Sequence, residues 1–194
     1  MSSPLSRLSD EELIAEAQND NEMAFNLLVG RFKDPLTNFV YRFVGDLDDC
    51  EDIVQETFVR VFRSRKSYRP IAKFSTWIYT IATNLAKSHL RRKKLRRIIS
   101  FSRSKDEPEP IYDIPDETAK ADALLESSIR EERIQKALDA LPVKYRQIAL
   151  LRDVQELTYE EIVAITRLPM GTVKSRINRA RALLQEMLKD LWSD

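Results

Sequence analysis

Residues 157–181 read LTYEEIVAITRLPMGTVKSRINRAR, a pattern that predicts two helices joined by a tight turn. Thr158 and Glu161 can form a capping box, in which a hydroxyl and a carboxylate satisfy free backbone amides at a helix start. This first helix is short, because the break at residues 166–169 follows Ile165. The longer helix after it has apolar residues three and four positions apart, at Val173, Ile177, Ala180, Leu184, Met187 and Leu191. A short helix, a tight turn and a longer basic helix indicate a helix-turn-helix, whose second helix enters the major groove of DNA.

That second helix carries polar and basic side chains on the side opposite its apolar stripe. Five of them are candidates for contact with duplex DNA: Thr172, Lys174, Ser175, Arg176 and Arg179. Arg and Lys at such positions can reach base edges in the major groove. The alternative is a helix of an ordinary bundle, whose polar surface faces only water.

Two further apolar stripes precede this unit. The first ends at Pro142 and carries Ile134, Ala137, Leu138 and Leu141, and the second carries Tyr145, Ile148, Ala149 and Leu151. Both have helical spacing. We therefore expect residues 129–194 to form one small helical domain.

From residue 98 to residue 128 the helical pattern gives way to Ser, Pro and acidic residues. Pro108, Pro110 and Pro115 lie among six acidic side chains, Asp106, Glu107, Glu109, Asp113, Asp116 and Glu117. Such a composition is typical of a flexible linker. An alternative is that its negative charge shields a basic surface nearby. We expect an acidic linker that joins two domains.

The stretch Thr57–Lys105 carries fifteen Lys and Arg residues and no Asp or Glu. Its net charge of +15 lies between −9 over residues 1–56 and −5 over residues 106–194, so the overall charge of +1 hides a strong separation. The aromatic residues in it are Phe58, Phe62, Tyr68, Phe74, Trp77, Tyr79 and Phe101. Cations interleaved with aromatics indicate a polyanion site, and nucleic acid uses both.

Within this block a basic loop leads into a long helix. The loop spans residues 64–73, and we expect Ser75 or Thr76 to cap the helix, which ends in the basic run 91–97. Its apolar residues are Trp77, Ile78, Ile81, Ala82 and Leu85. A lone charge run is usually a solvated helix face, but this one adjoins a basic loop and an aromatic cluster.

Three more helices are expected before the basic block. Ser9 and Glu12 read as a capped start, and Asp20 or Asn21 begins the next helix. Apolar stripes lie on both sides of Pro35, at Ala24, Phe25, Leu28, Val29 and Phe32 and at Leu36, Phe39, Val40 and Phe43. With three glycines in the chain and no run of alternating hydrophobicity, the sequence predicts an all-α fold.

The third of these helices begins in an acidic run, residues 46–52, and continues to Phe62. Carboxylates at a helix N-terminus are stabilised by the dipole, by about 0.3–1 kcal/mol each. An outward polar surface remains at Asp49, Asp52, Gln55, Glu56 and Arg60. A metal site is the other interpretation of the acids, but the run lacks the ligand spacing of a calcium loop.

Taken together, these stretches resemble the bacterial RNA polymerase sigma factors of the extracytoplasmic-function group, over nearly the whole chain. Residues 49–62 look like the helix of that family that docks on the clamp coiled coil of RNA polymerase. Residues 74–84 are similar to its promoter-melting segment, and residues 85–97 to the helix beside the minus-ten element. Residues 157–162 and 171–181 look like its reader of the minus-thirty-five element.

The resemblance implies a promoter-specificity subunit, with domains at residues 1–97 and 129–194. Its partners would be core RNA polymerase, promoter DNA and an anti-sigma factor, with no cofactor. The outward polar surface named above, from Asp49 to Arg60, would bind polymerase. The minus-ten element would be held by Arg65, Lys66, Lys73, Phe74, Trp77, Asn84, Lys87, Arg91 and Arg92. Asn84 offers a donor and an acceptor to a base edge, and cations and aromatics suit an opened strand.

The sequence departs from the family pattern at two positions. Arg167 stands where the family commonly has Gly in the turn of the helix-turn-helix, so either the turn is remodelled or a non-Gly residue at positive φ costs about 1 kcal/mol. Thr80 stands where many members carry Arg, which weakens any DNA contact there. We expect no further domain after Trp192.

Two other classes of protein are alternatives to a sigma factor. A stand-alone transcriptional regulator would use only the helix-turn-helix and bind DNA without polymerase. An enzyme is disfavoured, because His89 has no obvious acidic partner and Cys50 lies in an acidic helix start that raises a thiol pKa. The chain start lacks the apolar core of a signal peptide and no apolar run could span a bilayer, so we expect a cytoplasmic protein without membrane insertion.

Overall fold

The computed structural model describes residues 4–103 and 122–189, and most of the predicted linker lies outside these ranges. The first half contains α1 (Asp10–Gln18), α2 (Glu22–Val44), α3 (Leu47–Ser64) and α4 (Phe74–Arg103). The second contains α5 (Asp122–Ala140), α6 (Val143–Ala149), a π-helical turn (Leu150–Val154), α7 (Tyr159–Thr166) and α8 (Met170–Met187). Single 3₁₀ turns lie at Pro4–Arg7 and Arg65–Ser67. The described residues include no strand, which confirms the all-α prediction.

Three helix caps lie where the sequence predicts them. Ser9 and Glu12 form a capping box at α1, and Thr158 and Glu161 form another at α7. Asp46 caps α3, accepting a hydrogen bond from the amide of Asp49 at 3.0 Å. Side chains satisfy free amides at these ends, and each cap is worth about 1 kcal/mol.

Helix α2 runs through Pro35 as one helix and carries both of the apolar stripes that the sequence shows around it. Proline inside a helix removes one backbone hydrogen bond and costs about 3 kcal/mol. Burial of the apolar side chains on both sides outweighs this cost, since each large one contributes about 1.5–3 kcal/mol. Those that are buried are Leu28, Phe32, Leu36, Phe39, Val40 and Phe43.

Helix α4 begins one residue before the predicted caps Ser75 and Thr76. The amide of Phe74 donates to the Glu11 carboxylate of α1 at 2.9 Å, so a distant side chain satisfies this helix end. At its other end α4 extends to Arg103, and α5 begins at Asp122. Both helices therefore extend into residues 98–128, which were predicted as linker.

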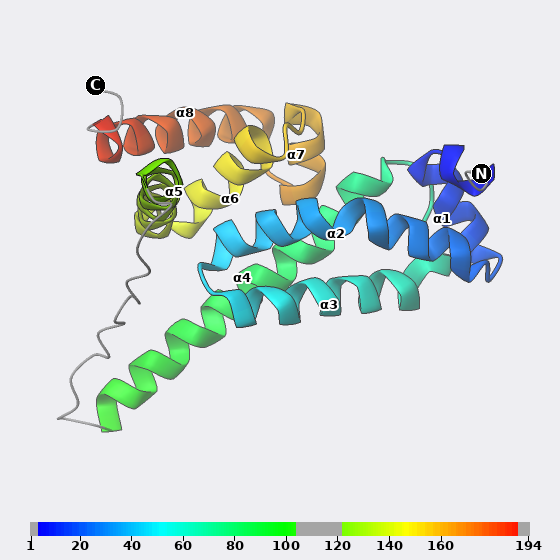
Figure 1. Ribbon diagram of the computed structural model, residues 1–194, viewed down its shortest axis with the longest axis horizontal. Coiled ribbons are helices and arrows are strands. Elements are labelled where there is room, and N and C mark those ends of the chain that lie inside the picture. The colour runs from blue at the N-terminus through cyan, green and yellow to red at the C-terminus, as the bar shows by residue number, and fades with distance from the viewer. Residues whose placement is uncertain (1–3, 104–121, 190–194) are drawn as a thin grey trace.

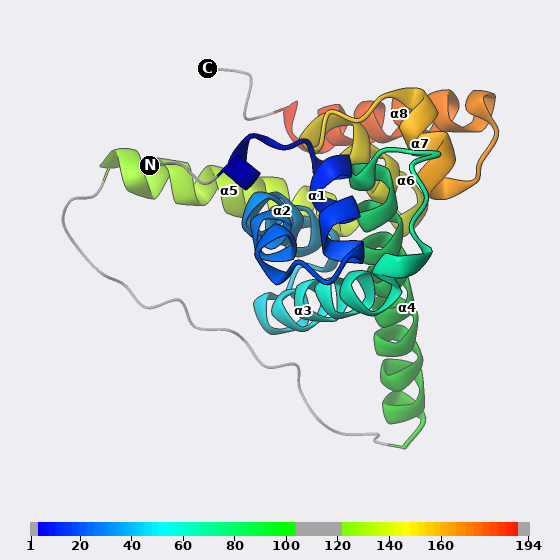
Figure 2. The same cartoon turned by 90° about the vertical axis from the view of Figure 1, so that its right-hand side faces the viewer.

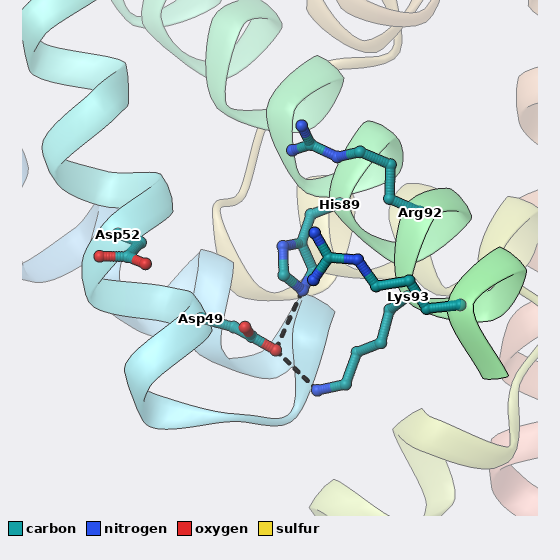
Figure 3. Close-up of a pocket in the computed structure, with 6 residues that line it drawn as sticks. Asp49, Asp52, His89, Arg92 and Lys93 are labelled. Atoms are coloured by element: carbon teal, nitrogen blue, oxygen red, sulfur yellow. Dashed lines mark hydrogen bonds and ion pairs between the residues drawn. The ribbon is translucent and has the colours of Figure 1, made fainter. Parts of the chain in front are cut away.

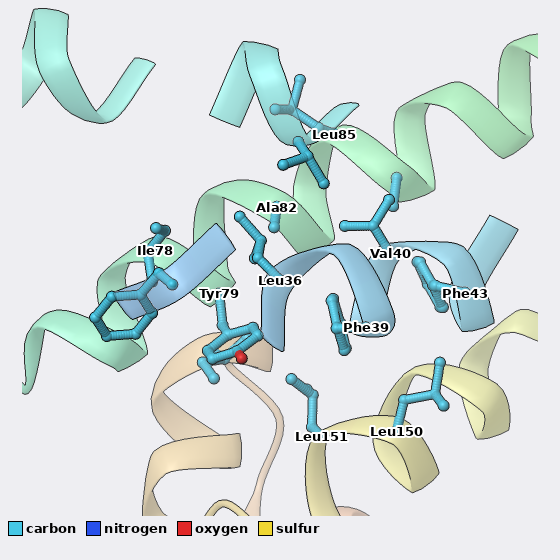
Figure 4. Close-up of a cluster of buried hydrophobic side chains, with 14 of the residues drawn as sticks. Leu36, Phe39, Val40, Phe43, Ile78, Tyr79, Ala82, Leu85, Leu150 and Leu151 are labelled. Carbon is cyan, nitrogen blue, oxygen red and sulfur yellow. The ribbon is translucent and has the colours of Figure 1, made fainter. Parts of the chain in front are cut away.

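The two halves pack on each other and share one hydrophobic core. Figure 1 shows the second half lying against α2, on the side opposite α3, and Figure 2 shows the same arrangement from the side. Figure 4 shows the shared interior, where Phe39 and Phe43 of α2 and Tyr79 of α4 lie beside Leu150 and Leu151 of the π-helical turn. All five side chains are at most 3% exposed.

The turn of the helix-turn-helix is not remodelled by Arg167. This residue adopts φ 58° and ψ 27°, the left-handed conformation, and its amide donates to the carbonyl of Val163 at 2.8 Å. Arginine therefore occupies a conformation that glycine adopts at lower cost.

Replacing Arg167 with Gly is expected to raise the free energy of unfolding by up to about 1 kcal/mol, because the left-handed strain disappears. The greater freedom of Gly in the unfolded chain offsets part of this gain. Arg167→Val is the matched control and should lower stability, since a β-branched residue tolerates positive φ poorly. Urea unfolding measures both, and a Gly variant less stable than the parent would contradict the strain.

Candidate DNA-binding and protein-docking surfaces

The predicted reading surface of α8 lies on its solvent side. Val173, Ile177 and Ala180 are fully buried and fix the orientation of the helix. Lys174, Ser175 and Arg179 are exposed, and Thr172 and Arg176 are half-buried. The Nζ atom of Lys174 lies 5.8 Å from the ring centroid of Tyr159 in α7, where the ring quadrupole attracts the ammonium. The five side chains thus form one polar and basic face, with the chemistry to contact a duplex.

The basic loop between α3 and α4 is internally bonded. Arg65 donates to the carbonyl of Ala17 at 3.0 Å and pairs with Asp20 at 2.6 Å, and its side chain is only 15% exposed. Lys66 also pairs with Asp20, at 3.0 Å, but stays 64% exposed. These two cations hold the pKa of the Asp20 carboxyl below its usual value. Arg65 therefore anchors the loop to α1, and Lys66 remains available to a phosphate.

Phe74 lies in the core and not on a binding surface. It is 1% exposed and packs edge-on against Phe32, with ring centroids 5.2 Å apart. The predicted DNA contact of Phe74 is not possible in this conformation. Trp77 is half-buried and packs against Phe74 and Tyr68, so these two rings support it from beneath.

An open pocket of about 470 Å³ lies between the end of α3 and α4. Trp77 and Asn84 line it, as predicted for a base site, together with Arg60, Arg63, Ser64, Ser67 and Ile81. Arg63 and Ser67 were missed; Arg63 lies one residue past the predicted helix end at Phe62, whereas α3 continues to Ser64 and places Arg63 on the same face as Arg60. An apolar wall, an amide and the exposed Arg63 suit a base with its phosphate.

The exposed face of α4 continues from this pocket. Asn84, Lys87 and Arg91 follow one another at helical spacing and are all exposed, as is Arg92. Thr80, by contrast, donates its hydroxyl to the carbonyl of Thr76 at 2.7 Å. It therefore adds little to this face, as its short side chain suggests.

A second pocket, of about 350 Å³, lies between the start of α3 and the far part of α4. Asp49, Asp52, His89, Arg92, Lys93 and Arg96 line it. Figure 3 shows Asp49 pointing at both His89 and Lys93. Its Oδ2 atom lies 3.0 Å from Nε2 of His89 and 2.6 Å from Nζ of Lys93. The prediction that His89 has no acidic partner is therefore wrong, although the imidazole is not in line for a hydrogen bond.

The remaining members of the predicted polymerase-binding surface lie along the outer side of α3. Asp52, Gln55 and Arg60 are exposed and Glu56 is half-buried, with Glu56 and Arg60 paired at 2.7 Å. Cys50 is fully buried beneath them. Burial, with a smaller effect of Glu51, raises the pKa of its thiol to about 11, in the predicted direction.

Polar contacts join the two halves beside the shared core. Lys73 of the basic loop pairs with Glu161 of α7 at 2.9 Å, and the Tyr79 hydroxyl contacts the Gln155 amide oxygen. Burial raises the pKa of Tyr79. In this arrangement Lys73 and Tyr79, both within or beside the predicted melting segment, are engaged by the second half.

Arg146 makes the most buried of these contacts. Its guanidinium donates to the carbonyl of Phe43 and to the carboxylate of Asp139, at 2.8 and 2.9 Å. Gly45, just after α2, adopts φ 77°, and an added Cβ there would lie 2.8 Å from the Asp139 carboxylate. Only glycine satisfies both the backbone conformation and this close approach.

Each half of the chain matches a known protein family. The Sigma-70 region 2 family matches residues 28–96, and the Sigma-70, region 4 family matches residues 131–184. The chain is 34% identical over 180 residues to the ECF RNA polymerase sigma factor SigW of Bacillus subtilis, covering 92% of this chain and 96% of that one. It is 32% identical over 189 residues to the RNA polymerase sigma-H factor of Pseudomonas aeruginosa, covering 96% and 97%.

Solved structures show the same fold. CnrH in complex with the cytosolic domain of CnrY superposes with a TM-score of 0.70 at 24% identity, covering 93% of this chain and 97% of that one. RpoE of Bartonella quintana, in complex with the anti-sigma factor NepR, gives a TM-score of 0.65 at 26% identity, covering 85% and 96%. In the part of this chain that the structure describes, every helix is too short or too polar to cross a lipid bilayer.

Proposed function

Because this chain belongs to the extracytoplasmic-function family of RNA polymerase sigma factors, we propose a division of tasks among the surfaces described above. The protein directs promoter-specific transcription initiation by core RNA polymerase. The match of both halves distinguishes it from a stand-alone helix-turn-helix regulator, which needs only the second. In the proposal it contributes recognition and strand capture in the cytoplasm, and polymerase carries out the chemistry.

The upstream promoter element is read as duplex by α8. The support is its single polar and basic face, with Lys174, Arg176 and Arg179 opposite a fully buried apolar stripe. Arginine can bond two acceptors on a guanine edge, which gives sequence discrimination. In the proposal this domain spans residues 129–194.

The downstream element is held as an opened strand by the domain of residues 1–97. The pocket lined by Trp77 and Asn84 carries this assignment, because it joins a supported aromatic wall to an exposed amide. Lys66 at the loop and Lys87, Arg91 and Arg92 along α4 supply cations for the backbone of the strand. Arg65 anchors the loop to α1, and Phe74 packs against Trp77 from the core side.

The outer side of α3 docks on polymerase through Asp52, Gln55, Glu56 and Arg60. The support is a row of polar side chains, of which Asp52, Gln55 and Arg60 are exposed, opposite the buried side of the same helix. We also propose an anti-sigma partner, since RpoE of Bartonella quintana was solved with one. Such a partner would mask these same surfaces.

Asn84→Ala tests strand capture. We expect the variant to fold and bind core polymerase normally but to form open complexes about tenfold less well, because one base contact is worth about 1–3 kcal/mol. Permanganate reactivity of unpaired thymines measures the opened fraction. On a template mismatched across the downstream element, part of the defect should disappear.

Asn26→Ala, at an exposed position of α2, is the matched control and should behave as the parent. Parental permanganate reactivity of the Asn84→Ala variant on fully paired DNA would show that this amide contacts no base.

A further inference from the structure

Helix α4 leaves the body of the protein near residue 90. Leu90 still packs against the core, but from Arg91 to Ile99 every side chain is exposed. Figures 1 and 2 show the last turns of α4 extending beyond the other helices. A helix beyond its last packed turn has little to hold its direction, because most helical stability comes from tertiary packing. Arg91 and Arg92, two of the cations assigned to the opened strand, lie on this projecting part, so its direction decides where their charges are placed.

Asp49 ties this projecting part to the start of α3. Its carboxylate contacts Lys93 at 2.6 Å and lies 3.0 Å from His89, which is one turn earlier on the same face of α4. The Asp49 side chain is 23% exposed, so solvent screens these contacts less than at an open surface. Asp46 adds a weaker contact to Lys93 at 3.5 Å. The hydrogen bond to Asp49 raises the pKa of Lys93.

Asp52 lies one turn later on α3 and differs from Asp49 in both its exposure and its ion pairing. It lines the same pocket but is exposed, and no ion pair holds it within the described part of the chain. Figure 3 shows its carboxylate apart from the contacts of Asp49. A protein partner can therefore pair with Asp52 directly, whereas Asp49 would first have to release Lys93.

We propose that Asp49 is a positioning residue for the strand-holding end of α4 and not a contact for polymerase. It pairs with Lys93 and lies against His89, and so fixes the direction in which Arg91 and Arg92 are presented. The inference rests on the proposed function, in which these cations hold the opened strand. Without the Asp49 charge, Arg92, Lys93 and Arg96 would repel one another around a pocket in which only Asp52 remains acidic.

The test compares Asp49→Asn with Asp52→Asn in the full chain. Two quantities are measured, the affinity for core polymerase and the opened fraction on a fully paired promoter with polymerase saturated. We expect Asp49→Asn to keep its core affinity within about twofold and to lower the opened fraction about fivefold, the scale of a partly screened ion-pair contact. Asp52→Asn should weaken core binding and, once polymerase is saturated, open the promoter normally.

A double-mutant cycle separates positioning from a general loss of structure. In a His89→Gln and Lys93→Met background, adding Asp49→Asn should change the opened fraction less than about twofold, because its partners on α4 are already gone. A full fivefold further loss would overturn the proposal, as would an Asp49→Asn variant with weakened core binding or with parental opening. If Asp52→Asn binds core polymerase normally, the docking assignment fails, while the Asp49 result still decides this inference.

Discussion

Replacing Arg146 with alanine is expected to lower the free energy of unfolding by about 3 kcal/mol, near the lower end of the cost of breaking a buried ion pair. Arg146 is 6% exposed and donates to three backbone carbonyls, those of Phe43, Asp139 and Leu141, as well as to the Asp139 carboxylate. The substitution leaves these oxygen acceptors without a hydrogen-bond donor where water reaches them poorly. The Asp139 side chain is 43% exposed and can be rehydrated, which keeps the cost from rising further.

The same substitution should loosen the packing of the two halves, because the Phe43 carbonyl belongs to α2 and Arg146 to α6. Urea unfolding measures the stability, and small-angle scattering measures the radius of gyration, which we expect to increase. Arg130→Ala, at an exposed position of α5, is the control and should change neither quantity. A stability loss below about 0.5 kcal/mol, the range of ordinary surface changes, would show that Arg146 does not hold the halves together.

Reversing two charges on the outer side of α3, with Asp52→Lys and Glu56→Lys together, is expected to weaken binding to core polymerase about a hundredfold. Asp52 is exposed and has no ion pair within the described residues. Replacing Glu56 removes its ion pair with Arg60, so that the two new lysines and Arg60 would lie together on the helix surface. Like charges facing a complementary partner surface oppose docking strongly. Titration of labelled core polymerase measures the affinity.

The control carries the same change of charge elsewhere, with Glu131→Lys and Glu186→Lys at exposed positions of α5 and α8. It should bind core polymerase as the parent does, and both proteins should keep parental helical circular dichroism. Parental affinity of the Asp52 and Glu56 variant would place the docking surface on another helix.

The features of the fold that the sequence predicted are local ones. The capping boxes at Ser9 and Thr158 lie within four residues, and the apolar face of α8 repeats at helical spacing. The cap of α4 joins Glu11 to Phe74, 63 residues apart, and no local pattern contains it. The continuity of α2 through Pro35 likewise depends on tertiary burial, which a local propensity cannot include.

In the candidate site, too, local features were predicted and contacts between distant residues were not. The exposed face of α8 was predicted, because helical phase alone separates exposed from buried positions, and the exposure of Asn84 agrees with the base contact that the family resemblance implies. The pairing of Arg65 with Asp20, of Lys73 with Glu161 and of His89 with Asp49 was not predicted. Each pair joins residues at least 40 positions apart, so the sequence shows these side chains without showing which residues they contact.

The shared core has a consequence for when the protein can change shape. Phe39, Phe43, Leu150 and Leu151 are each fully buried between the halves, and parting the halves would transfer them to water. Exposed apolar surface of this kind promotes self-association. Separation is therefore costly for the protein alone in solution. Another macromolecule would have to cover the parted faces to offset this cost, so the closed arrangement is the one expected of the free chain.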